Sequence, residues 1–228
     1  MNQQNQATLI LAGGYGALGQ VVARVAQDNG YAVALLGHRP DGVESSQTCL
    51  AMDVDLGDEA AVKQALAQVH QQFGRIDALV NVAGAFTYAR FTDSDAALWD
   101  KMFRSNVLTS VVTSRAVLPY FQQQKRGRIV FMGAKSATTG QPGMSAYTAA
   151  KSALARLTEA LAEEVKADGI TVNALLPTII DTPANRRDMP NADFNSWVKP
   201  ETLAQAMLSL IAGDAAFQTG SLIPMTGG

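Results

Sequence analysis

Tyr147 and Lys151 are the two side chains of this sequence best suited to acid–base chemistry. Three residues separate them near the start of a segment with helical spacing, so both lie on one face of the expected helix. A tyrosine with a pKa of about 10 is a poor proton donor at neutral pH, and a nearby ammonium lowers that pKa by stabilising the phenolate. The pair therefore fits a general acid for a carbonyl or imine. Because this spacing is frequent by chance, the prediction depends on the rest of the chain.

A glycine-rich turn at residues 13–19 predicts a site for a nucleotide phosphate. The turn follows the first apolar run and precedes a helical stripe of valines. Glycines let backbone N–H groups approach a pyrophosphate, and the helix N-terminus adds positive potential. A purely structural turn is the alternative, but its place after the first strand favours the nucleotide. The expected cofactor-binding residues of this turn are Gly13, Tyr15, Gly16, Ala17, Leu18 and Gly19.

The residues that follow the second and third apolar runs bear on the choice of cofactor. An NAD site usually has an Asp or Glu about 20 residues beyond the glycine turn, where it accepts from the ribose 2′-OH. Gly37 stands there, followed by His38 and Arg39, so no carboxylate repels a 2′-phosphate and Arg39 can pair with one. We therefore expect NADPH in preference to NADH, with Asp53 and Val54 beside the adenine. The alternatives are an Arg39 that faces water and an Asp53 that binds no ligand.

Seven short apolar runs alternate with segments of helical spacing and predict the fold. Nearly continuous apolar runs indicate strands buried on both faces, as in a parallel sheet. The alternation predicts one α/β domain over residues 1–228 with a doubly wound sheet. The irregular stretch 177–200 follows a strand end, where such sheets bind ligands, and predicts a substrate loop, with a surface excursion as the alternative. The runs are Thr8–Ala12, Ala32–Leu36, Cys49–Met52, Ala78–Val82, Arg128–Met132, Thr171–Leu176 and Ser221–Pro224.

Along nearly its whole length the chain resembles the short-chain dehydrogenase/reductase family. Six features match in order: the turn 13–19, Asp53, the turn Asn81–Gly84, Asn106, the Tyr147/Lys151 pair, and Leu176-Pro177 followed by Thr182. The resemblance implies a seven-stranded Rossmann fold and an NAD(P)H-dependent oxidoreductase. It makes Tyr147 the proton donor, Lys151 the group that holds the nicotinamide ribose and tunes Tyr147, and Asn106 the holder of a relay water. It also implies cofactor contacts from Asn81, Ala83, Gly84, Pro177, Ile180 and Thr182.

The sequence departs from the family where a catalytic serine is usual. That position, thirteen residues before the tyrosine, is Ala134, and Ser136 is displaced by two residues. Dihydropteridine reductases, a subgroup that reduces quinonoid dihydropterin, resemble this chain at Gly133-Ala134-Lys135 and through the loop 181–197. The resemblance therefore implies a pteridine-like substrate. Ala134, Phe86 and Trp197 are the expected substrate-site residues, the two aromatic rings by stacking, whereas Trp99 is expected to pack in the core.

Composition excludes several other classes of function. A net charge of −2 gives no electrostatic footprint for nucleic acid or anionic membrane. A single cysteine, Cys49, and two histidines make a metal site improbable, so no metal is expected. The uncharged first residues lack the basic region of a signal peptide, and we expect a cytoplasmic protein without a membrane span. Small and apolar residues on the helices 95–124 and 145–166 fit a homodimer or homotetramer interface, as the resemblance implies, or else internal packing.

Three functions remain open at this point. The first is dihydropteridine reductase-like reduction of a small molecule, in which an electron-poor ring needs orientation and one proton rather than strong polarisation. The second is reduction of another carbonyl or quinone, with Ser136 or a backbone group in place of the missing serine. The third is a Rossmann protein that senses nucleotide without catalysis. The presence of Tyr147, Lys151 and Asn106 together favours an enzyme.

Overall fold

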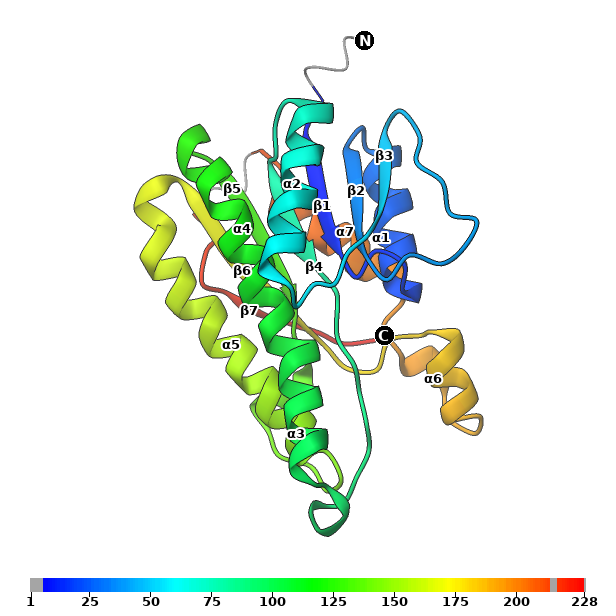
Figure 1. Ribbon diagram of the computed structural model, residues 1–228. Coiled ribbons are helices and arrows are strands. Elements are labelled where there is room, and N and C mark those ends of the chain that lie inside the picture. The colour runs from blue at the N-terminus through cyan, green and yellow to red at the C-terminus, as the bar shows by residue number, and fades with distance from the viewer. Residues whose placement is uncertain (1–5, 214–216, 228) are drawn as a thin grey trace.

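A single seven-stranded parallel sheet organises the chain. The structure, a computed structural model, describes residues 6–213 and 217–227 (Figure 1). The strand order is β3-β2-β1-β4-β5-β6-β7, with every neighbouring pair parallel, so the predicted α/β fold and sheet are confirmed. The strands are β1 Thr8–Ala12, β2 Ala32–Gly37, β3 Cys49–Asp53, β4 Ala78–Asn81, β5 Gly127–Met132, β6 Ile170–Pro177 and β7 Leu222–Met225.

Helices cover both faces of the sheet because alternate strand residues point to opposite sides. Figure 1 places α2, α4 and α5 on one face and α1 and α7 on the other, and two separate hydrophobic clusters fill these layers. The low charge of the sequence follows from this arrangement, since five strands are buried along their whole length on both sides. The helices are α1 Ala17–Asp28, α2 Glu59–Phe73, α3 Ala96–Phe103, α4 Thr109–Gln124, α5 Ser145–Val165, α6 Pro183–Asp188 and α7 Pro200–Ile211.

The long helix expected over 95–124 contains a defect at its centre. Asp95 caps its start by accepting from the N–H of Leu98 at 2.9 Å. Between α3 and α4, the five residues Arg104–Leu108 form a π-helical turn. Such turns are rare and frequently occur at functional sites, since the extra residue rotates the side chains that follow. Asn106 lies inside this turn.

The loop region 177–200 is more ordered than its four prolines suggest. It contains α6 and a short 3-10 turn, Phe194–Ser196. An isolated parallel bridge between Ile180 and Val198 joins its two ends. Figure 1 shows α6 projecting beside the ends of the strands, below the sheet. In the described residues, no helix is both long and apolar enough to cross a membrane.

The strand order fixes where a ligand enters. The chain winds in one direction from β1 to β3 and in the other from β4 to β7, so the direction reverses between the neighbours β1 and β4. In open α/β sheets, ligands bind in the crevice outside the carboxyl ends of the strands at this reversal. The glycine-rich turn after β1 and the turn after β4 both lie there.

Candidate active site

Close backbone packing shapes the glycine-rich turn. Gly13 has φ +81°, and a Cβ there would lie 2.6 Å from the backbone N of Ala83, so this position requires glycine. A Cβ on Gly19 would lie 2.4 Å from the carbonyl O of Gly13, so the first turn of α1 packs directly on the loop. Gly16 caps α1 without a side-chain hydrogen bond, which leaves the first N–H groups of the helix available to an anion. The turn has the form of a cradle for a pyrophosphate.

The backbone conformation of Gly37 disfavours an Asp or Glu at the end of β2, and Tyr15 packs beside it. Gly37 has φ +147°, a conformation that side-chain-bearing residues rarely adopt, and the Tyr15 ring lies 3.5 Å from the position of a Cβ. The Tyr15 hydroxyl lies within hydrogen-bond distance of the carbonyl oxygens of Met52, at 3.1 Å, and Leu35, at 3.2 Å. Burial raises the pKa of Tyr15. Tyr15 therefore braces the turn against β2 and β3.

Arg39 and Asp53 contact each other through the backbone at the same end of the sheet. The N–H of Arg39 donates to Asp53 Oδ1 at 3.1 Å, and Arg39 Nη1 donates to the carbonyl O of Val43 at 2.9 Å. Both side chains are exposed. The structure thus engages one carboxylate oxygen of Asp53 and one end of the Arg39 guanidinium. The remaining donors of Arg39 point to no partner among the described residues.

A cleft of about 500 Å³ runs from this turn to the end of β4. It lies within the size range of small-molecule sites. Of the predicted cofactor residues it contains Gly13, Gly16, His38, Val54, Ala83 and Gly84, and its other lining residues are Gly37, Asp55, Leu56, Gly57, Val82, Ala85, Arg104, Ser105, Leu108 and Thr109. The glycine turn, the residues after β2 and β3 and the turn after β4 therefore meet in one cleft. Other predicted cofactor residues do not line it, among them Arg39, Asp53, Tyr147, Lys151, Ile180 and Thr182.

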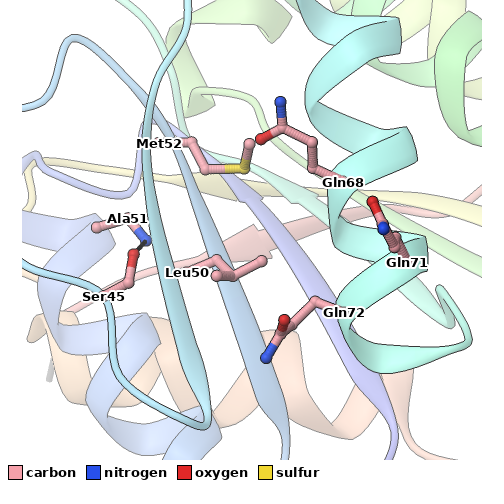
Figure 2. Close-up of a pocket in the computed structure, with 7 residues that line it drawn as sticks. All are labelled: Ser45, Leu50, Ala51, Met52, Gln68, Gln71 and Gln72. Carbon is pink, nitrogen blue, oxygen red and sulfur yellow. Dashed lines mark hydrogen bonds between the residues drawn. The ribbon is translucent and has the colours of Figure 1, made fainter.

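A second cavity, of about 510 Å³, lies between β3 and α2 and has a different character. Figure 2 shows Gln68, Gln71 and Gln72 of α2 opposite Leu50 and Met52 of β3. Its remaining lining residues are Ser45 and Ala51. No acid–base side chain and none of the predicted site residues lines it, so this cavity is not the candidate site.

Asn81 shapes the turn after β4 from below. Its side chain is buried, with Oδ1 accepting from the N–H of Ala83 at 2.9 Å and Nδ2 donating to Thr113 Oγ1 at 3.2 Å. Asn81 thereby fixes the backbone of Ala83, which lines the cleft together with Val82 and Gly84.

Asn106 and Lys151 meet beneath this turn because Gly84 has no side chain. A Cβ on Gly84 would lie 2.7 Å from Asn106 Oδ1 and 3.4 Å from Lys151 Nζ. Asn106 Nδ2 donates to the carbonyl oxygens of Ala85 and Met102, both at 2.9 Å, whereas its buried Oδ1 has no partner among the described residues. A buried acceptor without a partner calls for a water or a ligand.

Tyr147 stands one helical turn before Lys151 on α5. Lys151 Nζ lies 5.9 Å from the centre of the Tyr147 ring and donates to the carbonyl O of Met132 at 2.7 Å. Burial lowers the pKa of Lys151 to about 8 and raises the pKa of Tyr147 to about 12. The expected lowering of the tyrosine pKa by Lys151 is therefore wrong for the protein without ligand, because the desolvation of the phenol dominates.

The glycine cradle, the open N-terminus of α1 and the orphaned oxygen of Asn106 together fit a nicotinamide cofactor. The cradle has the form that phosphate groups require, and the Tyr147–Lys151–Asn106 cluster stands beyond the β4 turn. Comparison with known proteins agrees with this geometry: the short chain dehydrogenase family pattern matches residues 7–193. The chain belongs to the short-chain dehydrogenase family.

Relatives and solved structures support the assignment along the full chain. The chain is similar to 2-(S)-hydroxypropyl-CoM dehydrogenase 3 of Xanthobacter autotrophicus, with 28% identity over 100% of this chain and 98% of the relative. It is also similar to meso-2,3-butanediol dehydrogenase of Serratia marcescens, with 29% identity over 100% and 96%. The structure described as ElxO with NADP bound has the same fold, with a TM-score of 0.89, 23% identity and 96% coverage of both chains. This short-chain dehydrogenase is thus an oxidoreductase of that family.

The substrate side of this short-chain dehydrogenase lacks the usual hydroxyl. Ala134 is buried at the end of β5 and precedes a 3-10 turn, Lys135–Thr138. The hydroxyl oxygen of Ser136, within that turn, is shut off from solvent and has no hydrogen-bond partner among the described residues. Neither residue presents a hydroxyl to an open cleft in this structure.

Two aromatic residues stand next to the Tyr147 helix. Phe86, 55% exposed, meets the Tyr147 ring edge-on, with ring centres 5.0 Å apart and planes at 90°. Tyr88, 63% exposed, packs over Gly143, since a Cβ there would lie 2.2 Å from the Tyr88 ring. The N–H of Ala89 donates to the carbonyl O of Gly143 at 2.9 Å and fixes the contact. Phe86 was expected at the site from the sequence, whereas Tyr88 was not, because its contact with Gly143 joins residues far apart in the chain.

Trp197 does not occupy the place that we expected. Only 4% of it is exposed, and its ring packs on Phe194 with centres 4.8 Å apart. An exposed ring on the substrate loop is therefore the wrong interpretation: the loop folds back on itself and uses Trp197 as its own core. Trp99 packs with a small hydrophobic cluster, as expected.

Hydrogen bonds give the loop 177–200, the expected substrate loop and called the lid below, a defined shape. Thr182 caps α6 by accepting from the N–H of Asn185 at 3.2 Å, which leaves its hydroxyl proton free. Ile180 O accepts from Asn185 Nδ2 at 2.8 Å. The bridge to Val198 uses Ile179 O and the N–H of Asp181, so the N–H of Ile180 points to the opposite side. Pro177 ends β6 beside Met225.

Asp181 ties the lid together electrostatically. Its carboxylate accepts from Arg186 of α6 and from Lys199 Nζ, the latter at 2.7 Å, just before α7. Hydrogen bonds from Arg186 and then Lys199 hold the pKa of Asp181 far below its usual range. The Arg186 guanidinium lies 4.6 Å from the centre of the Phe194 ring, a cation–π distance. The motif residues of 181–197 thus specify the shape of the lid.

Proposed function

We propose that this short-chain dehydrogenase is an NAD(P)H-dependent reductase of a flat, conjugated ring, with quinonoid dihydropterin as the leading substrate. The carrying observation is the combination of an intact Tyr147–Lys151–Asn106 cluster with Ala134 where the family has a serine. An acceptor that is already electron-poor needs orientation and a proton, and it loses little when the polarising hydroxyl is absent. The exposed rings of Phe86 and Tyr88 supply apolar surface for such a ring beside Tyr147.

The residues of the chain divide the work in this proposal. A bound reduced nicotinamide cofactor supplies the hydride, two electrons that reduce one C=N unit of the ring. Tyr147 donates its phenolic proton to the nitrogen that gains charge, so the product is neutral. Lys151 binds the ribose hydroxyls and stabilises the phenolate that is left. Asn106 Oδ1 holds the water through which Tyr147 regains a proton.

We expect NADPH to be preferred over NADH. The strained conformation of Gly37 keeps a carboxylate away from the ribose 2′ position, and the donors of Arg39 that remain unpaired are suitable for a 2′-phosphate. The carboxamide of the nicotinamide would be held by the N–H of Ile180 and the hydroxyl of Thr182. The ratio of kcat/KM for the two cofactors measures the preference.

The test of the proposed activity uses purified protein and quinonoid dihydropterin with NADPH and NADH in turn. Absorbance loss at the reduced nicotinamide band measures turnover. We expect turnover with at least one cofactor, abolished in Tyr147→Phe. Cofactor binding without turnover of this substrate would contradict the pteridine assignment while leaving the reductase class intact.

Reduction of another carbonyl or quinone is the second candidate. It is favoured by the relatives named above, whose names describe dehydrogenases of hydroxyl compounds, the reverse of carbonyl reduction. The buried hydroxyl of Ser136 would then have to turn toward the substrate. Ser136→Ala separates the two candidates: it abolishes ketone reduction if Ser136 polarises the carbonyl, and it leaves dihydropterin reduction nearly unchanged.

We further propose a homodimer or homotetramer that uses α4 and α5. The small and apolar residues expected to form the interface lie on the helices predicted at 95–124 and 145–166. Of these, Val107, Val112 and Ala150 are buried within the chain itself. Ala149 is exposed and Val111 and Ala153 are half-buried, so they remain available to a partner. Sedimentation of wild type and Ala149→Glu tests this proposal, with dissociation expected in the variant. A monomeric wild type would refute it.

A further inference from the structure

One wall of the cofactor cleft is formed by the π-helical turn and the start of α4. Arg104, Ser105, Leu108 and Thr109 all line it. Their spacing of one, four and five residues places them on one side of the helix that runs through the π-helical turn. Asn106, inside the same turn, is fully buried under Gly84. One face of this π-helical turn therefore contacts the proton-transfer cluster, and another face lines the cleft.

The other lining residues of the cleft indicate which part of the cofactor lies near Arg104. The glycine turn and the start of α1 take the phosphates, and Tyr147 and Lys151 mark the nicotinamide end. The residues after β2 and β3, His38 and Val54 to Gly57, line the remaining end of the cleft. In doubly wound sheets the adenosine half of a dinucleotide lies at that end. Arg104 lines the same cleft as these residues on the adenosine side, so its exposed side chain is available to the adenosine half.

The guanidinium group of Arg104 is fixed by one hydrogen bond and is exposed to solvent. Its Nε donates to Asp100 Oδ2 at 2.7 Å, four residues earlier on the helix, and its side chain is 66% exposed. No other hydrogen bond to this guanidinium is found within the described part of the chain. A guanidinium fixed through Nε keeps both faces and its two terminal nitrogens free, and guanidinium planes stack well on aromatic rings.

We propose that Arg104 stacks on the adenine ring of the cofactor and so contributes to the affinity for both nicotinamide cofactors. Leu108, in the next helical turn on the same wall, adds apolar contact, and Asp100 is the positioning residue that orients the guanidinium. This inference rests on the proposed cofactor. It assigns a role to Arg104 that is separate from the role of Arg39 at the 2′-phosphate.

The experiment measures dissociation constants of four ligands by calorimetry: NADPH, NADH, ADP and reduced nicotinamide mononucleotide, which lacks adenosine. For Arg104→Ala we expect roughly fivefold to thirtyfold weaker binding of the first three and no change for the mononucleotide. Arg115→Ala is the matched control, since Arg115 is an exposed helical arginine paired with Glu59 outside the cleft. Thermal melts of each variant confirm that it is folded.

Other outcomes overturn the inference in distinct ways. A loss confined to NADPH would place Arg104 on the 2′-phosphate, and recovery of affinity in Arg104→Lys would show charge pairing rather than stacking. Unchanged affinities in Arg104→Ala would remove Arg104 from the site. If the wild-type protein binds none of the four ligands, the proposed function fails as a whole, and that result is distinguishable from all of these.

Discussion

The two ends of the candidate site are built by different means. At the nucleotide end, backbone approaches backbone: the turn after β1 touches the turn after β4, and Gly13 and Gly19 lie where a Cβ would meet backbone atoms at less than 3 Å. At the substrate end, side chains hold side chains: Asp181 binds Arg186 and Lys199, and Phe194 lies between Arg186 and Trp197. Backbone packing tolerates few changes, whereas a side-chain lid can be altered to suit another substrate.

Tyr147→Phe gives the largest expected effect. It removes the proton donor without changing the packing of either end of the site. Loss of the proton donor lowers kcat by about 10²- to 10⁴-fold, the usual contribution of a general acid. The ring and its edge-on contact with Phe86 persist, so the dissociation constant of the cofactor and the melting temperature change little. Steady-state kinetics and calorimetry measure both quantities. Tyr120→Phe, a tyrosine on α4 whose ring packs beside His70, is the control. Full turnover in Tyr147→Phe would show that Tyr147 is not the proton donor.

Gly84→Ala gives the next largest expected effect, at the contact between the β4 turn and the Asn106–Lys151 pair. The added Cβ would meet Asn106 Oδ1 at 2.7 Å, so the β4 turn or the π-helical turn must shift. Overpacking of this kind costs about 1–3 kcal/mol of stability, and displacement of the reacting groups lowers kcat/KM by roughly a hundredfold. Denaturant unfolding and kinetics measure the two effects. Gly140→Ala is the matched control, because no heavy atom lies within 4 Å of its Cβ position. Equal effects in both variants would contradict the packing argument.

The difference between the ends also explains what the sequence could predict. The strand Thr8–Ala12 was predicted to the residue, and the glycine turn was placed correctly, because buried parallel strands and tight turns leave local patterns. The contact between Tyr88 and Gly143 joins residues far apart in the chain, and no local pattern marks it. The burial of Trp197 depends on Phe194 and the fold of the lid. The π-helical turn at Arg104–Leu108 needs tertiary packing to select it over a regular helix.

Asp181→Asn is expected to act on the lid alone. The neutral amide holds Arg186 and Lys199 less well, so α6 is less firmly positioned over the substrate. We expect KM for the substrate to rise several-fold, roughly the loss of one charge-assisted hydrogen bond, with the dissociation constant of ADP unchanged. Asp193→Asn, at the neighbouring 3-10 turn, keeps an acceptor for its cap and serves as the control. A weaker affinity for ADP in Asp181→Asn would show that the two ends are coupled.

Lys151 lies between Gly84 and Tyr147. Its lowered pKa predicts a small change in stability with a specific pH dependence. With a pKa of about 8 in the folded protein against roughly 10.4 in an unfolded chain, the buried ammonium is destabilising below pH 8. Between these two values the unfolded chain binds more protons, so this cost disappears as the pH rises. Lys151→Met should therefore gain thermal stability relative to wild type at pH 7, and the gain should shrink toward pH 10. Thermal melts across this range measure it, with the exposed Lys63→Met as control. A difference independent of pH would mean that the hydrogen bond to Met132 O, not the buried charge, governs the stability of this position.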